Sequence, residues 1–250
     1  MFISTTRDLV NHSHPSLIAG GRATLQAMSK PNHTRLLLIR HGATTLSAED
    51  RFAGATDVQL SEEGRAQATA LGERLMSEAL SAIYVSPMGR TRETAQLASG
   101  GRSVTLNVED GLREINHGRW EQKTRAEVEA SFPDEYASWE ADPFTFAPEG
   151  GESGAAVMAR ALPVIRKIVV AHVGSTVAVV SHKATIRLIL CGILGIDARG
   201  YRDRLDQSPA CLNVLDFKDA VNARLQLYND TSHYSISPRR PGAALSKWFG

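Results

Sequence analysis

Two histidines of this sequence each follow an apolar run that has the character of a buried strand. His41 comes after residues 36–39, all leucine or isoleucine, with only Arg40 between them, and His182 comes after residues 176–180 with only Ser181 between them. A neutral imidazole nitrogen can attack phosphorus, and a neighbouring guanidinium stabilises the charge on phosphoryl oxygens. In open α/β sheets, ligands collect beyond the carboxyl ends of the strands. The three side chains are therefore candidates for one phosphoryl-transfer site, although polar turns could explain each histidine alone.

Two further segments carry residue types that phosphoryl chemistry needs. Arg90 follows the apolar run 82–85 at the start of a predicted helix, where a guanidinium can bind phosphate oxygens through parallel hydrogen bonds. Glu114 stands between Leu112 and Ile115, where partial burial can raise the pKa of the carboxyl enough for acid catalysis. The alternative for both is a solvated surface side chain paired with a neighbour of opposite charge.

The elements that would position these residues alternate between strands and helices, the pattern of a sheet covered by helices. Strands are predicted at residues 36–39, 82–85, 104–108, 176–180, 211–217 and 223–228. Helices are predicted at residues 61–80, 88–98, 124–141 (two helices broken at Pro133), 153–173 and 184–194. We expect the last two strands to form a hairpin toward the sheet edge. The fold class is α/β, a single three-layer domain whose central, mostly parallel sheet is flanked by helices.

Composition narrows the class of protein. The 250 residues carry a net charge of +1, so attraction for phosphate must be local, and neither nucleic acid nor a membrane is expected as a partner. The sequence shows no membrane-spanning stretch and no clear signal peptide. Cys191 and Cys211 indicate reduced thiols and a cytoplasmic location. We expect residues 1–33 to be a poorly ordered extension, 34–236 the domain and 237–250 a tail.

Five segments together resemble the histidine phosphatase superfamily, in its phosphoglycerate mutase-like branch. In chain order they read "RHG", "RFAGATDVQLSEEG", "SPMGRTRETA", "LREINHGRWE" and "VVSHK". Each segment is weak evidence alone, but five in the family's order and spacing are strong. The resemblance runs from about residue 36 to about residue 234 and implies the phosphoglycerate mutase-like fold.

The resemblance also implies a role for each candidate residue. His41 would be phosphorylated, Glu114 would donate a proton to the leaving oxygen, and Arg40, Arg90 and His182 would surround the transferred phosphoryl group. Water would then hydrolyse the phosphohistidine, so no metal and no other cofactor is expected. Contacts to the substrate are expected from Ser47, Gly54, His117 and Lys183.

Departures from the mutases favour a phosphatase. Ser47 stands where mutases carry a phosphate-binding asparagine, Ala53 replaces a hydroxyl residue, and Lys183 and Ala184 replace Gly-Asn after the second histidine. A mutase must reorient its phosphorylated intermediate without losing the phosphate to water. We therefore expect a metal-independent phosphomonoester hydrolase that acts on a small phosphorylated metabolite through a phosphohistidine.

Three other functions stay open at this point. The nearest is a phosphomutase that acts on a small phosphorylated acid. A metalloprotein is another, because Glu114 and His117 have the i, i+3 spacing of carboxylate-bridged di-iron proteins, which need a second such pair on a helical bundle. The third is a non-catalytic module that binds a phosphate ligand on the same fold. The sequence leaves open which metabolite is the substrate, and a homodimer is among the possible assemblies.

Overall fold

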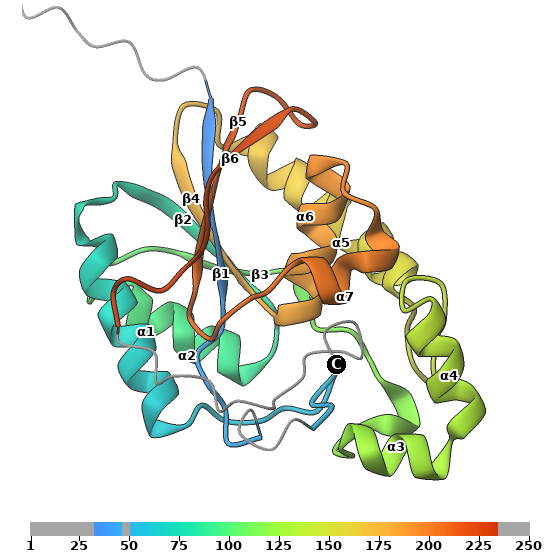
Figure 1. Ribbon diagram of the computed structural model, residues 1–250. Helices are drawn as coiled ribbons and strands as arrows, with labels where there is room; N and C mark the ends of the chain where they lie inside the picture. The colour runs from blue at the N-terminus through green and yellow to red at the C-terminus, as the bar shows by residue number, and fades with distance from the viewer. Residues whose placement is uncertain (1–32, 47–50, 235–250) are drawn as a thin grey trace, which may run out of the picture.

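The computed structural model describes residues 33–46 and 51–234, and a six-stranded sheet forms its centre (Figure 1). The strand order is β3 (Leu106–Val108), β2 (Leu80–Val85), β4 (Thr176–Ser181), β1 (Thr34–Arg40), β5 (Leu212–Phe217) and β6 (Ala223–Asp230). The first four strands are parallel, β5 is antiparallel to β1, and β6 is antiparallel to β5. The mostly parallel sheet and the late hairpin at its edge are thus confirmed.

Helices cover both faces of the sheet, as predicted (Figure 1). Leu37 and Ile39 of β1 pack with residues of α1 (Glu62–Arg74) and α2 (Gly89–Ala98). Leu36 and Leu38 pack on the opposite face, with residues of α5 (Gly154–Ala171) and α6 (Lys183–Leu194). Successive side chains of a strand point to opposite faces, so an all-apolar run is what burial on both faces requires.

The helix predicted at residues 61–80 is shorter than expected. Ser61 caps α1, since its hydroxyl accepts a hydrogen bond from the Gly64 N–H at 3.1 Å, but the helix ends at Arg74. One turn of 3₁₀ helix follows, and Leu80 already belongs to β2, where it pairs with Thr176 of β4. The apolar helical pattern of residues 61–80 did not reveal that Leu80 belongs to a strand.

A smaller aromatic cluster lies beyond the sheet. The helices α3 (Arg125–Ser131) and α4 (Pro133–Ala141) are separated at Phe132, because the proline begins a new helix, as predicted. Trp120, Val128, Tyr136 and Trp139 form the buried part of this cluster. In Figure 1, α3 and α4 lie toward the end of the molecule where β1 finishes.

Some predictions fall outside the described residues. These are the N-terminal extension up to residue 32, the tail 237–250 and the substrate contact from Ser47. Cys191 and Cys211 are both free and buried. Among the described residues, none of the helices combines the length and the apolar character needed to cross a membrane.

Candidate active site

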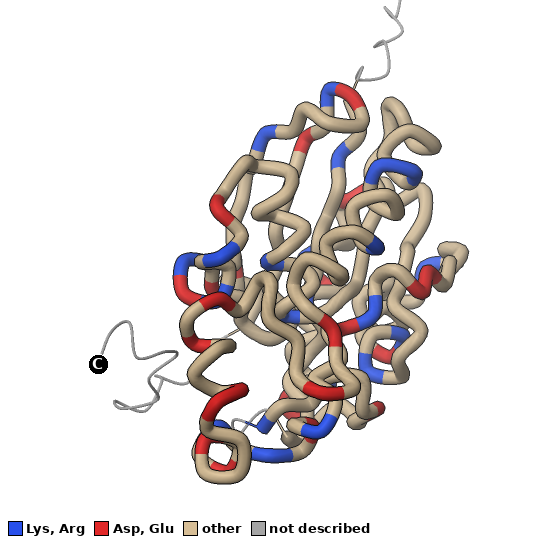
Figure 2. The backbone as a smooth tube through the Cα atoms, turned by 90° about the vertical axis from the view of Figure 1, so that its right-hand side faces the viewer, with Lys and Arg blue, Asp and Glu red and all other residues tan. Residues whose placement is uncertain are grey.

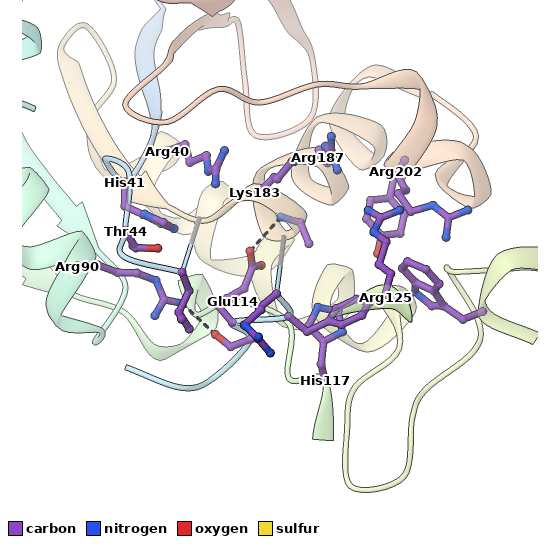
Figure 3. Close-up of a pocket in the computed structure, with 18 residues that line it drawn as sticks. Arg40, His41, Thr44, Arg90, Glu114, His117, Arg125, Lys183, Arg187 and Arg202 are labelled. Carbon is purple, nitrogen blue, oxygen red and sulfur yellow. Dashed lines mark hydrogen bonds between the residues drawn. The ribbon is translucent and has the colours of Figure 1, made fainter. Parts of the chain in front are cut away.

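A pocket of about 190 Å³ lies at the carboxyl ends of β1 and β4 (Figure 3). This volume is below the roughly 300–1,000 Å³ of most ligand pockets, which favours a small ligand. Its lining is strongly cationic, with one carboxylate, Glu114, against seven basic side chains: Arg40, Arg51, Arg90, Arg125, Lys183, Arg187 and Arg202. An anion is the ligand that such a lining suits.

The strand register brings the two histidines together. Arg40 of β1 is paired with Ser181 of β4, so the next residue of each strand, His41 and His182, leaves the sheet at the same edge. The His41 N–H donates to the Ser181 carbonyl at 3.0 Å, and the two ring centroids are 5.1 Å apart. The prediction that both histidines reach one site is consistent with this arrangement.

The His41 ring is held as a nucleophile would be. Its Nδ1 lies 2.7 Å from the Gly42 carbonyl oxygen, which can only accept, so Nδ1 carries the proton and Nε2 keeps its lone pair. Burial, and then the charges of Arg40 and Arg90, hold the pKa of His41 well below 6.5. The ring is therefore neutral, with an unprotonated Nε2 that can attack phosphorus.

His182 is fully buried beside His41 and is not one of the pocket-lining residues. Arg90 Nε donates to its Nδ1 at 3.2 Å, and its Nε2 lies 2.8 Å from the Ser86 hydroxyl. A guanidinium only donates hydrogen bonds, so Nδ1 of His182 is unprotonated and Nε2 carries the proton. Burial and the charge of Arg90 hold the pKa of His182 well below 6.5. His182 thus orients Arg90 and packs on His41, whereas its contact with a phosphoryl group stays a prediction.

Arg90 is almost completely buried and firmly oriented. Besides its bond to His182, it donates to the carbonyl oxygens of Thr56 at 2.7 Å and Gly54 at 2.9 Å. A guanidinium has five N–H groups, so two remain for a ligand. Arg90 is therefore not the solvated surface side chain of the alternative interpretation.

Gly54 lines the pocket and also shapes the loop that holds Arg90. Its φ of 47° lies in the left-handed region that glycine adopts readily, and a Cβ here would lie 2.3 Å from Glu121 Oε1. Glu121 accepts hydrogen bonds from the N–H groups of Ala55 at 2.7 Å and Thr56 at 2.9 Å. The loop is therefore tied down where its carbonyls meet Arg90.

Glu114 is only 9% exposed, so it is not the solvated loop acid of the alternative interpretation. Its Oε1 accepts from the Ile115 N–H at 2.9 Å and from the Thr185 N–H at 3.1 Å. The Thr185 hydroxyl shares its one proton between Oε1 at 3.0 Å and the Arg113 carbonyl oxygen at 2.8 Å. Its Oε2 accepts from the Ala184 N–H at 3.1 Å. The carboxylate thus caps the N-terminus of α6, and Oε2 has the greater capacity left for a ligand.

The arginines beside Glu114 in sequence pair elsewhere. Arg113 forms ion pairs with Asp110 and with Glu152, and Arg119 pairs with Glu135 and Glu149. The carboxylate of Glu114 therefore faces the cationic pocket.

Two of the predicted substrate contacts also lie at the pocket. His117 lines it, with its ring 4.7 Å from that of Phe52, and burial lowers its pKa below 6.5. Lys183 lines it from the first turn of α6. Burial, followed by the charges of Arg187 and Arg40, lowers the pKa of Lys183 to about 7. Lys183 forms no ion pair with any residue that the structure describes.

Several pocket residues were missed by the sequence analysis: Thr44, Phe52, Arg125, Trp139, Arg187, Tyr201 and Arg202. One of them had a signal, since Arg187 lies on the predicted helix 184–194 and follows Lys183 by four residues. A helix that begins one residue earlier, as α6 does, places both on one face. Tyr201 and Arg202 come from α7 (Tyr201–Arg204), a short helix with no periodic pattern to reveal it.

The di-iron interpretation finds no second ligand pair. Within residues 33–46 and 51–234, no three His, Cys, Asp or Glu side chains gather where they could hold a metal ion. The Glu114 carboxylate instead accepts hydrogen bonds from two N–H groups of α6.

The tautomers of the two histidines give a prediction that needs no substrate. At pH 6.5, where an ordinary histidine is half protonated, His41 should be neutral with its proton on Nδ1, and His182 neutral with its proton on Nε2. Nitrogen NMR of ¹⁵N-histidine-labelled protein checks this, with the His41→Ala and His182→Ala variants to assign the signals. Imidazolium signals from either ring at pH 6.5 would contradict the electrostatics described above.

Comparisons with known proteins agree with this geometry. Residues 36–231 match the family model described as histidine phosphatase superfamily (branch 1). The chain is 34% identical over 199 residues to phosphoserine phosphatase 1 of Hydrogenobacter thermophilus, covering 80% of this chain and 93% of that protein. It is 35% identical over 221 residues to glucosyl-3-phosphoglycerate phosphatase of Mycolicibacterium vanbaalenii, covering 78% and 97%. The solved structure of Bacillus stearothermophilus YhfR superposes with a TM-score of 0.75 at 32% identity, covering 80% of this chain and 98% of that one.

Proposed function

Because the chain belongs to branch 1 of the histidine phosphatase superfamily, we propose that it hydrolyses small phosphomonoesters through a phosphohistidine at His41. Its relatives are named as phosphatases, and this chain is a phosphoric monoester hydrolase. The observation that carries the residue assignment is the His41 ring, which is neutral, has a free Nε2 and lies between Arg40 and Arg90.

The first half-reaction transfers the phosphoryl group to the enzyme. As the bond between His41 Nε2 and phosphorus forms, the bond from phosphorus to the ester oxygen breaks, and that oxygen takes a proton from Glu114. Arg40 and the two remaining N–H groups of Arg90 stabilise the equatorial oxygens. The hydrogen bonds from α6 stabilise the carboxylate that Glu114 becomes.

The second half-reaction regenerates the enzyme. Water attacks phosphorus and gives a proton to the Glu114 carboxylate, while the bond from phosphorus to Nε2 breaks and inorganic phosphate forms. His41 is then again neutral with Nε2 unprotonated, and Glu114 is again the acid. Each group ends the cycle in its starting state.

The substrate is proposed to be a small phosphorylated metabolite. The two relatives are named for phosphoserine and for glucosyl-3-phosphoglycerate, so each name contains a carboxylic acid, serine in one and glycerate in the other. The pocket volume of about 190 Å³ favours the small end of this range.

Nucleic acid has little support as a partner. Figure 2 shows Lys and Arg interspersed with Asp and Glu along the described chain, so the positive charge of the pocket is a local feature. This mixture and the net charge of +1 support the proposal that nucleic acid is not a partner. The free thiols of Cys191 and Cys211 support a cytoplasmic location.

Incubation with 3-phosphoglycerate tests the activity against the phosphomutase alternative. We expect release of inorganic phosphate without accumulation of the 2-phospho isomer, and the same rate in excess EDTA, because arginines rather than a metal would stabilise the phosphoryl charge. Free phosphate and isomer are measured in the same sample. Accumulation of isomer without free phosphate would favour a mutase, and loss of activity in EDTA that a divalent cation restores would rule out the metal-independent mechanism.

A further inference from the structure

Two cations in the pocket, Lys183 and Arg187, have no part in the chemistry proposed above. They lie one turn apart on α6, and both line the pocket beside Arg40. In Figure 3, Arg40, Lys183 and Arg187 lie along one side of the pocket, while His41 and Arg90 lie at its reaction end. The α6 pair would therefore face the part of the substrate that is not the transferred phosphoryl group.

These cations are incompletely compensated. Arg187 is 5% exposed, and its one ion pair among the described residues joins Nη2 to Asp206 Oδ1 at 3.5 Å. Its Nε is buried without a hydrogen-bond partner, and so is the Nε of Arg40. Lys183 forms no ion pair with the described residues. Buried charges and buried donors are costly unless they are paired, so this wall of the pocket is suited to an anion.

Other basic residues of the pocket already have partners. Arg90 donates to three acceptors, and Arg51 pairs with Glu127 at 3.1 Å. Arg202 pairs with Glu140 at 2.9 Å and lies over the Trp139 ring. The unmatched positive charge is therefore concentrated on Lys183 and Arg187 of α6 and on the neighbouring Arg40.

On the premise of the proposed phosphatase activity, we infer that Lys183 and Arg187 form a second anion subsite, which selects phosphomonoesters that also carry a carboxylate. The forked guanidinium of Arg187 suits a carboxylate, and Lys183 supplies a second charge at the rim of the same wall. A pocket of about 190 Å³ has room for a carboxylate only a few bonds from the phosphate ester.

A matched pair of substrates isolates the carboxylate. 3-Phosphoglycerate and glycerol 3-phosphate differ mainly in a carboxylate that is replaced by a hydroxymethyl group. The wild-type protein should prefer 3-phosphoglycerate in kcat/KM. Lys183→Gln and Arg187→Gln should each reduce that preference by on the order of tenfold to a hundredfold, mainly through KM, because the contact persists throughout the reaction.

Two controls keep this test decisive. Arg166→Gln removes one positive charge from an exposed position of α5 outside the pocket, and it should leave the preference unchanged. Because Arg187 is buried, Arg187→Lys is measured beside Arg187→Gln, with thermal unfolding of each variant. A folded Arg187→Lys should keep more of the preference than Arg187→Gln.

The pH dependence of the preference gives an independent readout. The groups around the Lys183 ammonium are Arg187 on the same helix, Arg40 at the end of β1, Asp206 after α7 and Arg125 on α3. With a pKa of about 7, Lys183 is charged below neutral pH and loses its charge above it. The wild-type preference should therefore fall between pH 6 and pH 8, and this fall should be absent from Lys183→Gln. The phosphate groups of the two esters ionise over a similar pH range. Their ionisation therefore largely cancels in the ratio of the two kcat/KM values.

The outcomes separate the two proposals. If the wild-type protein hydrolyses neither ester nor any other phosphomonoester, the proposed function fails. If it hydrolyses both esters without preference, or if the folded variants lose both activities equally, the subsite is wrong while the phosphatase stands.

Discussion

His41→Ala is expected to abolish turnover, with a loss on the order of 10⁴-fold or more, because no other group replaces the attacking nitrogen. The loss should be similar for 3-phosphoglycerate and for 4-nitrophenyl phosphate, since both esters must first phosphorylate His41. Within the part of the chain that the structure describes, the ring makes one hydrogen bond, to the carbonyl of its neighbour Gly42, so the variant should still fold. Steady-state phosphate release and thermal unfolding measure the two effects.

A matched control uses a histidine outside the pocket. His172 lies at the end of α5, where its ring contacts Tyr84 and Ser81. His172→Ala should keep activity close to that of the wild type. A His41→Ala variant that retains more than about a tenth of wild-type activity would exclude His41 as the nucleophile.

Glu114→Gln is expected to reduce hydrolysis of alkyl phosphates within the roughly 10²–10⁴-fold range of general acid catalysis. The amide keeps the shape of the side chain but cannot give a proton to the leaving oxygen. An aryl ester such as 4-nitrophenyl phosphate has a stable leaving group, so phosphorylation of His41 by that ester should lose much less. Single-turnover measurements of enzyme phosphorylation compare the two esters.

The amide also changes the cap of α6, so its structural effect needs a separate control. Thr185→Val removes the hydroxyl whose proton is shared by Glu114 Oε1 and the Arg113 carbonyl oxygen, and it leaves the carboxyl itself in place. It should disturb the position of Glu114 without producing a difference between the two esters. Equal losses of His41 phosphorylation for both esters in Glu114→Gln would count against Glu114 as the acid.

Much of the fold follows from local patterns in the sequence. The run at residues 36–39 predicts a strand buried on both faces, and Leu36 and Leu37 do pack on opposite faces. Pro133 separates α3 from α4 as predicted, because proline is favoured in the first turn of a helix. The end of α1 was not predictable in this way, since Leu80 suits a helix face as well as the strand that contains it.

The candidate site also combines features that local sequence patterns predict with features that they do not. The place of His41 and His182 follows from two strand ends, once the strands are parallel neighbours. The bond from His182 to Ser86 depends on the register of a third strand and has no local signal. Glu114 was expected to be partly buried, but its four hydrogen bonds come largely from the N-terminus of α6, about 70 residues later in the chain. Contacts between such distant segments are set by tertiary packing, which local periodicity does not encode.

Direct capture of the phosphorylated enzyme tests the central claim. The protein is mixed with ³²P-labelled substrate, quenched within milliseconds in base, digested, and the labelled peptide is sequenced by mass spectrometry. Phosphate on Nε2 of His41, stable in base and labile in acid, is the predicted result, because Nδ1 is bound to the Gly42 carbonyl. Phosphate on His182, or turnover without any phosphohistidine, would contradict the account.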